Sequence, residues 1–198
     1  MPYARQDEIT WLPGQYYHLY NRGARRLTIF REEVNYRFVL ERMKKYGKLF
    51  TLSIIAYCLM PNHYHVLVRQ NGLAPAGWLV QRTFNSYSKV YNKLYQQSGT
   101  LFEGRYKAVL VNEERYLRHL CYYIHANPVK DGITHQIEAW PYANYLEWIG
   151  QRNGTLVDHA FVQEYFGGGA SYAATMLEFV RTRGYLAQEF SHLSWHQA

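Results

Sequence analysis

Strand-like and helix-like hydrophobic patterns alternate along the 198 residues of this chain. Aromatic and β-branched residues interleaved with polar ones predict four strands, over residues 14–23, 50–60, 63–70 and 101–112. Apolar residues spaced three and four apart predict three amphipathic helices, over residues 31–48, 78–97 and 113–132. Pro61 and Asn62 are a turn signal that should join the two central strands into a hairpin. Pro128 should end or kink the third helix.

The order strand, helix, strand, strand, helix, strand, helix is typical of an α+β fold of the ferredoxin-like, split βαβ type. Such a fold has an antiparallel sheet that carries helices on one face and leaves the other available. RNA-recognition modules share this RRM-like arrangement, so the fold does not by itself select a function.

The pattern changes after residue 133. Residues 154–166 and 174–183 have helical patterns, and the glycine-rich residues 167–171 between them indicate a flexible joint or a cap. We therefore expect two units, a basic domain over residues 1–133 and an aromatic, helical C-terminal extension over residues 134–198.

Charge is distributed unevenly along the chain. Residues 1–112 hold 16 lysines and arginines and 6 acidic residues. Residues 113–198 hold 6 lysines and arginines and 9 acidic residues. A basic surface favours a polyanionic partner, most often a nucleic acid, although solubility alone would also explain it. The twenty tyrosines suit stacking on unpaired bases and equally suit ordinary packing.

Cysteine spacing and the length of apolar runs argue against several protein classes. Cys58 and Cys121 are far apart and form no CxxC motif, so neither a disulfide framework nor a structural zinc site is indicated. The apolar runs are short, and the N-terminus lacks the layout of a signal peptide. We expect a soluble, cytoplasmic protein without a membrane partner.

Residues 60–68 read MPNHYHVLV and place two histidines one residue apart in a predicted strand. Because side chains alternate between faces, His63 and His65 should share one face, with Cα atoms roughly 7 Å apart. This spacing can chelate a divalent cation if at least one further ligand is supplied. Taken alone, strand histidines more often hydrogen-bond or face solvent, so a packing interpretation stays open at this point.

The third predicted helix offers further candidates. Tyr123 and Asn127 are one turn apart on one face, near the C-terminal end of the helix. A tyrosine can act as a nucleophile, and an amide oxygen suits a hard cation. Tyr122 lies about 100° around the helix, so only one of the two adjacent tyrosines can share the direction of Asn127. His119 and His125 are candidate general bases, and packing explains each equally well.

Two motifs carry a family resemblance. MPNHYHVLV has a histidine-hydrophobic-histidine form, and CYYIHANPVKDG has the form Tyr-Ile-His-x-Asn-Pro-Val. In these segments the sequence resembles the HUH single-tyrosine transposases of the insertion-sequence-200 type, and most closely their REP-associated tyrosine transposase branch. The resemblance spans about residues 14–150, with the motifs in the right order.

The resemblance implies a site and an activity. It implies that His63 and His65 bind a divalent metal, Mg²⁺ or Mn²⁺, that Asn127 is the third ligand, and that Tyr123 is the attacking nucleophile. Residues 1–133 would be the catalytic domain. Enzymes of this type nick and rejoin single-stranded DNA, typically beside a hairpin, through a 5′-phosphotyrosine intermediate and without ATP. A bacterial, nucleoid-associated protein is implied, and a monomer is slightly favoured over a homodimer.

Basic residues supply candidate contacts to DNA phosphates. The candidates are Arg22, Arg25, Arg26, Lys89, Lys93, Arg105 and Lys107. Two other functions fit the same residues. One is a non-catalytic RRM-like module that binds nucleic acid without cutting it. The other is a phosphodiesterase in which a metal activates water.

Overall fold

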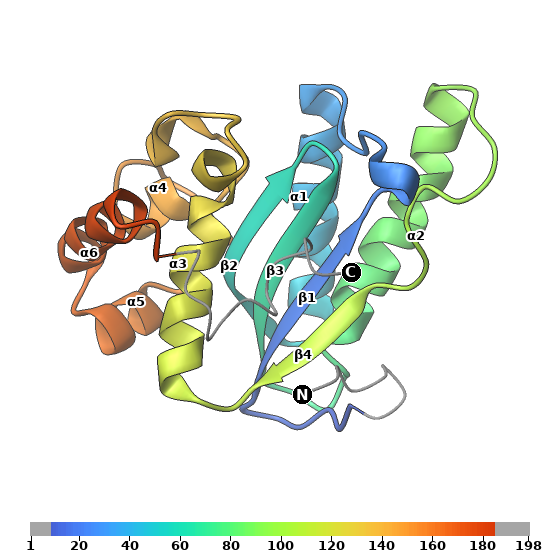
Figure 1. Ribbon diagram of the computed structural model, residues 1–198. Coiled ribbons are helices and arrows are strands. Elements are labelled where there is room, and N and C mark those ends of the chain that lie inside the picture. The colour runs from blue at the N-terminus through green and yellow to red at the C-terminus, as the bar shows by residue number, and fades with distance from the viewer. Residues whose placement is uncertain (1–8, 185–198) are drawn as a thin grey trace.

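The computed structural model describes residues 9–184, so residues 1–8 and 185–198, the outer ends of the two predicted units, lie outside it. Its strands are β1 (Tyr16–Arg22), β2 (Leu52–Met60), β3 (His63–Gln70) and β4 (Lys107–Val111). Its α-helices are α1 (Glu33–Leu49), α2 (Gly77–Leu94), α3 (Glu114–Lys130), α4 (Tyr145–Trp148), α5 (His159–Phe166) and α6 (Gly169–Arg181) (Figure 1). Two short 3-10 turns are η2 (Ala24–Arg26) and η3 (Ile137–Ala139).

The four strands form one antiparallel sheet in the order β2-β3-β1-β4. Strands β2 and β3 make the predicted hairpin, in which Met60 lies opposite His63 across the turn. Helices α1 and α2 connect β1 to β2 and β3 to β4, as the split βαβ pattern requires. The predicted α+β, ferredoxin-like class is therefore confirmed.

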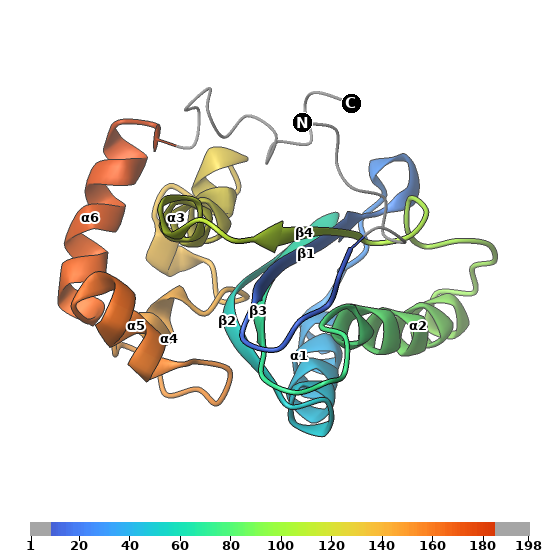
Figure 2. The ribbon, with the colours of Figure 1, turned by 90° about the horizontal axis from the view of Figure 1, so that it is seen from below.

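Alternating side chains of the sheet pack into two separate hydrophobic cores, one on each face. Leu19, Val66 and Val68 are buried against the layer of α1 and α2, on one side of the sheet (Figure 2). Leu67, on the opposite face, belongs to a second core with α3. This second face is not left open, because α3 buries its own apolar stripe, which includes Leu120, against β2 and neighbouring strands.

The fourth strand is shorter than predicted, because its first half forms a loop. Within residues 101–106, Phe102 pairs with Gly23 in an isolated bridge, and Gly104 adopts a φ of 70°. Glycine is the residue that tolerates this conformation at little cost, so the chain turns here before β4 begins at Lys107. The loop thereby lies next to the end of β1.

Strand β2 lies at an edge of the sheet, and the segment after α3 covers part of it. The backbone of Leu59 donates to the carbonyl of Tyr142, at 2.9 Å. The side chain of Asn144 accepts from the amide of Tyr57 and donates to the carbonyl of Ile55, both at 2.8 Å. The register of β2 shifts at Ile55, so some backbone groups of this strand are not hydrogen-bonded to β3. Asn144 provides hydrogen-bond partners for such groups.

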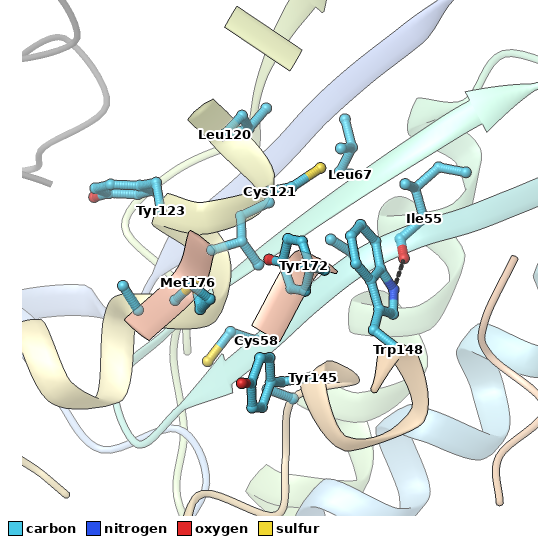
Figure 3. Close-up of a cluster of buried hydrophobic side chains, with 14 of the residues drawn as sticks. Ile55, Cys58, Leu67, Leu120, Cys121, Tyr123, Tyr145, Trp148, Tyr172 and Met176 are labelled. Carbon is cyan, nitrogen blue, oxygen red and sulfur yellow. Dashed lines mark hydrogen bonds between the residues drawn. The ribbon is translucent and has the colours of Figure 1, made fainter. Parts of the chain in front are cut away.

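The C-terminal helices share a buried cluster with α3 and β2. Trp148 and Tyr172 pack with ring centroids 4.6 Å apart, and the indole nitrogen of Trp148 donates to the carbonyl of Ile55 at 3.1 Å (Figure 3). Cys58 and Cys121 are free thiols buried in the same cluster. The boundary between residues 133 and 134 stays a prediction, and across it the chain packs through this common core.

Within residues 9–184, no helix is both long and apolar enough to cross a membrane. The longest, α2, has 18 residues and carries Arg82, Lys89 and Lys93 at exposed positions.

Candidate active site

The two histidines of β3 are buried on the sheet face that meets α3. His63 is 7% exposed and His65 is 0% exposed. Nδ1 of His65 lies 2.9 Å from Nε2 of His18 on the neighbouring strand β1, and Nδ1 of His63 lies 2.7 Å from Oδ1 of Asn62. Contacts of this kind at one ring nitrogen orient the other nitrogen of a metal-ligating histidine. Nε2 of His65 is buried and has no hydrogen-bond partner within the described part of the chain.

Side chains spaced four residues apart on α3 face this histidine pair. The rings of Tyr123 and His65 meet edge to face, with centroids 5.6 Å apart. Oδ2 of Asp131 lies 3.7 Å from Nε2 of His63. Asn127 is one helical turn from both Tyr123 and Asp131, so its side chain belongs to the same stripe. The fold thus brings together His63, His65 and Tyr123, and helical spacing places Asn127 on the same side of α3.

The orientation of Asn127 follows from the proline beside it. Helix α3 runs through Pro128 and ends at Lys130. Proline lacks an amide hydrogen, so the carbonyl four residues earlier, that of Ile124, loses its helical partner. Nδ2 of Asn127 donates to the carbonyls of Tyr123, at 2.8 Å, and Ile124, at 3.4 Å. Its Oδ1 is then directed elsewhere, and this buried atom has no hydrogen-bond partner among residues 9–184.

These residues fit a divalent metal ion. A buried acceptor without a partner costs roughly 1–3 kcal/mol, and a cation bound to His65 and Asn127 would remove that cost. Burial, with His18, His63 and Lys130 nearby, lowers the pKa of His65 well below its usual value, so the ring is a neutral imidazole, which is the form that binds metals. Among the described residues, no group of three or more His, Cys, Asp or Glu side chains could hold a metal. A metal bound by the two histidines would therefore need a ligand of another type, and the amide oxygen of Asn127 is one that the helix places on this side of α3.

Lys130 is a member of this cluster that the sequence motifs did not nominate. Its Nζ lies 3.2 Å from the hydroxyl of Tyr123 and 3.1 Å from Oδ1 of Asp131, and its side chain is 9% exposed. Burial opposes the charged form, but attraction to Tyr123 and Asp131 outweighs burial and raises the pKa of Lys130. The tyrosine hydroxyl therefore has a fixed cation beside it.

The neighbouring candidates on α3 face the C-terminal helices. The ring of Tyr122 stacks on that of Tyr172, with centroids 5.2 Å apart. His125 uses both ring nitrogens, at 2.7 Å from the hydroxyl of Tyr172 and 2.9 Å from Oδ1 of Asn144. The ring of His119 packs against Phe179. In Figure 3 the hydroxyl of Tyr123 points away from Tyr172, so the adjacent tyrosines diverge as their helical positions require.

Comparison with known proteins places this arrangement in a family. Residues 12–127, more than half of the chain, match the family described as IS200-like transposases. The chain belongs to this family. The resemblance noted in the motifs to transposases of the insertion-sequence-200 type is thereby confirmed. The two relatives described next are named as REP-associated tyrosine transposases.

Two relatives of this family member are informative. One is a protein of Haemophilus influenzae named as a REP-associated tyrosine transposase, which is 25% identical to this chain over 107 residues. The alignment covers 48% of this chain and 60% of that protein. The chain therefore matches less than two thirds of that relative's length. A solved structure of a REP-associated tyrosine transposase bound to a REP hairpin aligns with a TM-score of 0.59 and 17% identity, over 80% of this chain and 94% of that one. At that identity the likeness shows a shared fold.

The predicted phosphate contacts of this family member lie in two places. Near the histidine end of the sheet are Arg22, Arg25, Arg26 and Lys107. Along α2 and the loop before β4 are Lys89, Lys93 and Arg105. Six of the seven are exposed, whereas Arg22 is partly buried and pairs with Glu103, its Nη2 at 3.0 Å from Oε1. A DNA phosphate would have to compete with Glu103 for Arg22.

Proposed function

We propose that this protein is a metal-dependent transesterase that nicks and rejoins single-stranded DNA at or near hairpins, with Tyr123 as its nucleophile. Membership of the IS200-like transposase family supports the reaction class. The contact that carries the proposal is the 5.6 Å approach of the Tyr123 ring to the His65 ring, because it joins the two motifs in one site.

The reaction exchanges one phosphodiester for another. The hydroxyl oxygen of Tyr123 attacks the phosphorus, a new bond forms between this oxygen and phosphorus, and the bond to the 3′-oxygen breaks. The products are a 5′-phosphotyrosine and a free 3′-hydroxyl, which takes up a proton while tyrosine loses one. Because the bond energy is kept in the phosphotyrosine, a 3′-hydroxyl can later attack it and rejoin the strand without ATP.

His63, His65 and Asn127 would hold the divalent ion, Mg²⁺ or Mn²⁺. When bound, such an ion stabilises charge on the phosphate oxygens and orients the leaving oxygen. His18 and Asn62 act through the histidines by fixing their ring orientations. The buried position of Nε2 of His65 and Oδ1 of Asn127 supports this set of ligands.

Lys130 would stabilise the phenolate of Tyr123. A lysine whose pKa is raised is protonated at neutral pH and cannot accept the tyrosine proton. Its ammonium group instead favours the ionised oxygen that attacks phosphorus. The proton then passes to water, or to another group once DNA is bound.

The partner we propose is single-stranded or hairpin DNA. The relative of known structure is described as bound to a REP hairpin, and the basic N-terminal part of this chain suits the same class of ligand. Tyr123 and His65 belong to one chain, which supports a site assembled within a monomer. A protein with this activity would act at the bacterial nucleoid.

One observation favours a second candidate function, a non-catalytic module that binds nucleic acid. Tyr123 is 1% exposed, so its hydroxyl reaches a phosphate only if neighbouring groups move when DNA binds. A module without catalysis needs no such movement. A phosphodiesterase that activates water through the metal would also leave Tyr123 unused.

A cleavage assay separates the three functions. We expect labelled hairpin DNA with a single-stranded flank to be nicked in Mn²⁺ by the wild-type protein and by Tyr122→Phe. Tyr123→Phe should bind the DNA without nicking it. Nicking by Tyr123→Phe at the wild-type rate would support water activation, and absence of nicking by the wild type would support the binding module.

A further inference from the structure

A cavity of about 700 Å³ lies between α2 and the loop before β4. Its volume falls within the usual range of ligand sites, roughly 300–1,000 Å³. It opens on the sheet face opposite to His63 and His65, because Tyr64, which lies between them in β3, contributes to its lining. Its aromatic lining residues are Trp11, Tyr64, Trp78, Phe84, Phe102 and Tyr106.

The floor of the cavity is a preformed aromatic surface. The rings of Tyr64 and Phe84 stack with centroids 3.9 Å apart, and Phe102 meets Phe84 edge to face at 5.2 Å. At the rim, Trp78 remains 43% exposed although its ring packs against Phe50 at 5.5 Å. A large exposed indole beside a buried aromatic floor is a surface on which a planar ring can stack.

Polar groups of α2 line the same cavity. Trp78, Gln81, Asn85 and Ser88 form one stripe along the helix, at spacings of three and four residues. The carboxamides of Gln81 and Asn85 are exposed, and each offers both donors and an acceptor to the edge of a base. The lining includes Arg105 and no acidic side chain, which suits a ligand that carries phosphate.

The cavity and the histidine pair lie back to back at one end of the sheet. Asn21 and Tyr64 pair across β1 and β3 and line the cavity, whereas the next pair, Arg22 and His63, projects to the other face. A strand of DNA that passes around this end of the sheet would therefore meet both sites.

We propose that this cavity binds an unpaired nucleobase from the single-stranded flank of the DNA. The base stacks against Trp78 at the rim, its edge meets the carboxamide of Asn85 or Gln81, and its phosphate lies near Arg105. The choice of DNA as the ligand rests on the proposed function. The binding itself requires neither the metal nor the chemistry of Tyr123.

The test measures binding apart from cleavage. The probe is a fluorescein-labelled DNA single strand of mixed sequence, about twelve nucleotides long, in EDTA, with Tyr123→Phe as the parent protein. Adding Trp78→Ala should weaken binding about tenfold or more, as expected for loss of a stacking aromatic. Asn85→Ala, at an exposed position, should weaken it by a smaller factor. Val90→Ala is the matched control, because Val90 is also 43% exposed on α2 and lies outside the cavity lining.

A blunt hairpin without an unpaired flank is the second probe. Its affinity should be the same for the parent and for Trp78→Ala. The proposal fails if Trp78→Ala and Asn85→Ala bind the single strand within twofold of the parent, or if Val90→Ala loses as much as Trp78→Ala. An equal loss on the blunt hairpin would also overturn it. These measurements involve no strand cleavage. They can therefore be interpreted even if the proposed cleavage reaction is shown to be wrong.

Discussion

The ammonium nitrogen of Lys130 lies 3.2 Å from the hydroxyl oxygen of Tyr123, two helical turns earlier on α3. The same nitrogen lies 4.9 Å from the centroid of the tyrosine ring. A phenol ionises with a pKa near 10 in water, and a fixed cation at this distance favours the ionised form. If Tyr123 is the nucleophile, as we propose, Lys130 lowers the cost of ionising it without itself removing the proton.

Replacing Lys130 with methionine keeps an unbranched side chain, one heavy atom shorter, and removes its charge. We expect the covalent adduct to form roughly 10- to 100-fold more slowly, because a hydrogen bond to a charged group contributes about 1.5–3 kcal/mol. The pH at which the rate begins to rise should also be higher in this variant than in the wild type, since the phenolate loses its stabilising charge. Single-turnover rates across a pH series measure both effects. Lys44→Met removes an exposed lysine of α1, and an equal slowing in that variant would assign the effect to net charge alone.

The proposed metal site makes a prediction that needs no DNA. Mn²⁺ titration followed by electron paramagnetic resonance should show tight binding to the wild type and none to His65→Ala. His18→Ala should bind Mn²⁺ about 10- to 100-fold more weakly, because loss of an orienting partner costs roughly that factor. His135→Ala, at an exposed position, should bind as the wild type does. Unchanged binding by His65→Ala would rule out this site.

Variants of Asn127 and Pro128 should change the free energy of unfolding and the affinity for Mn²⁺ independently of each other. Asn127→Ala leaves the carbonyl of Ile124 without a donor, which costs about 1–3 kcal/mol of unfolding free energy. It also removes the buried Oδ1 that has no partner among residues 9–184, so the net loss should be smaller than this. Adding Pro128→Ala restores an amide hydrogen at that carbonyl, so the double variant should regain most of this stability. Mn²⁺ binding should stay weak in both. Urea denaturation with Mn²⁺ titration measures the two quantities, and recovery of metal binding in the double variant would remove Asn127 from the ligand set.

The hairpin of β2 and β3 and the stripe on α3 were predictable because both follow from local periodicity. Alternation put His63 and His65 on one face, and helical spacing put Tyr123 and Asn127 on another. The contact between His18 and His65 was not predictable, because it depends on the register in which β1 pairs with β3. The contact of Lys130 with Tyr123 was also not predictable, since it requires the helix to continue past Pro128 and to bury a lysine.

The packing of the C-terminal helices on α3 could not be predicted from sequence periodicity, for a similar reason. Their apolar faces were visible, but these helices pack on Tyr122 and His125 of α3 together with Asn144, which lies 19 residues after His125, and the sequence does not show that these groups meet. His125 looked like a candidate base because of its place in the motif. The fold shows why it has another role, since both of its ring nitrogens join α3 to residues of the extension.

His125 makes acid lability a prediction. Burial lowers its folded-state pKa to about 4 from a usual 6.5, so as pH falls the unfolded chain binds the proton first. The free energy of unfolding should therefore be fully retained above about pH 6.5 and decrease down to about pH 4, by on the order of 3 kcal/mol. Urea denaturation of the wild type and His125→Gln across this range isolates the contribution of His125. Parallel pH curves for the two proteins would contradict it.

Mass spectrometry of the covalent product tests the central claim most directly. The protein is incubated with hairpin DNA and Mn²⁺, digested with nuclease and trypsin, and the peptide spanning residues 119–130 is fragmented. This peptide contains both Tyr122 and Tyr123, so its fragments distinguish them. We predict a 5′-nucleotide phosphodiester on Tyr123 alone, lost in Tyr123→Phe and retained in Tyr122→Phe. A modified Tyr122, or cleaved DNA with both tyrosines unmodified during turnover, would contradict the account.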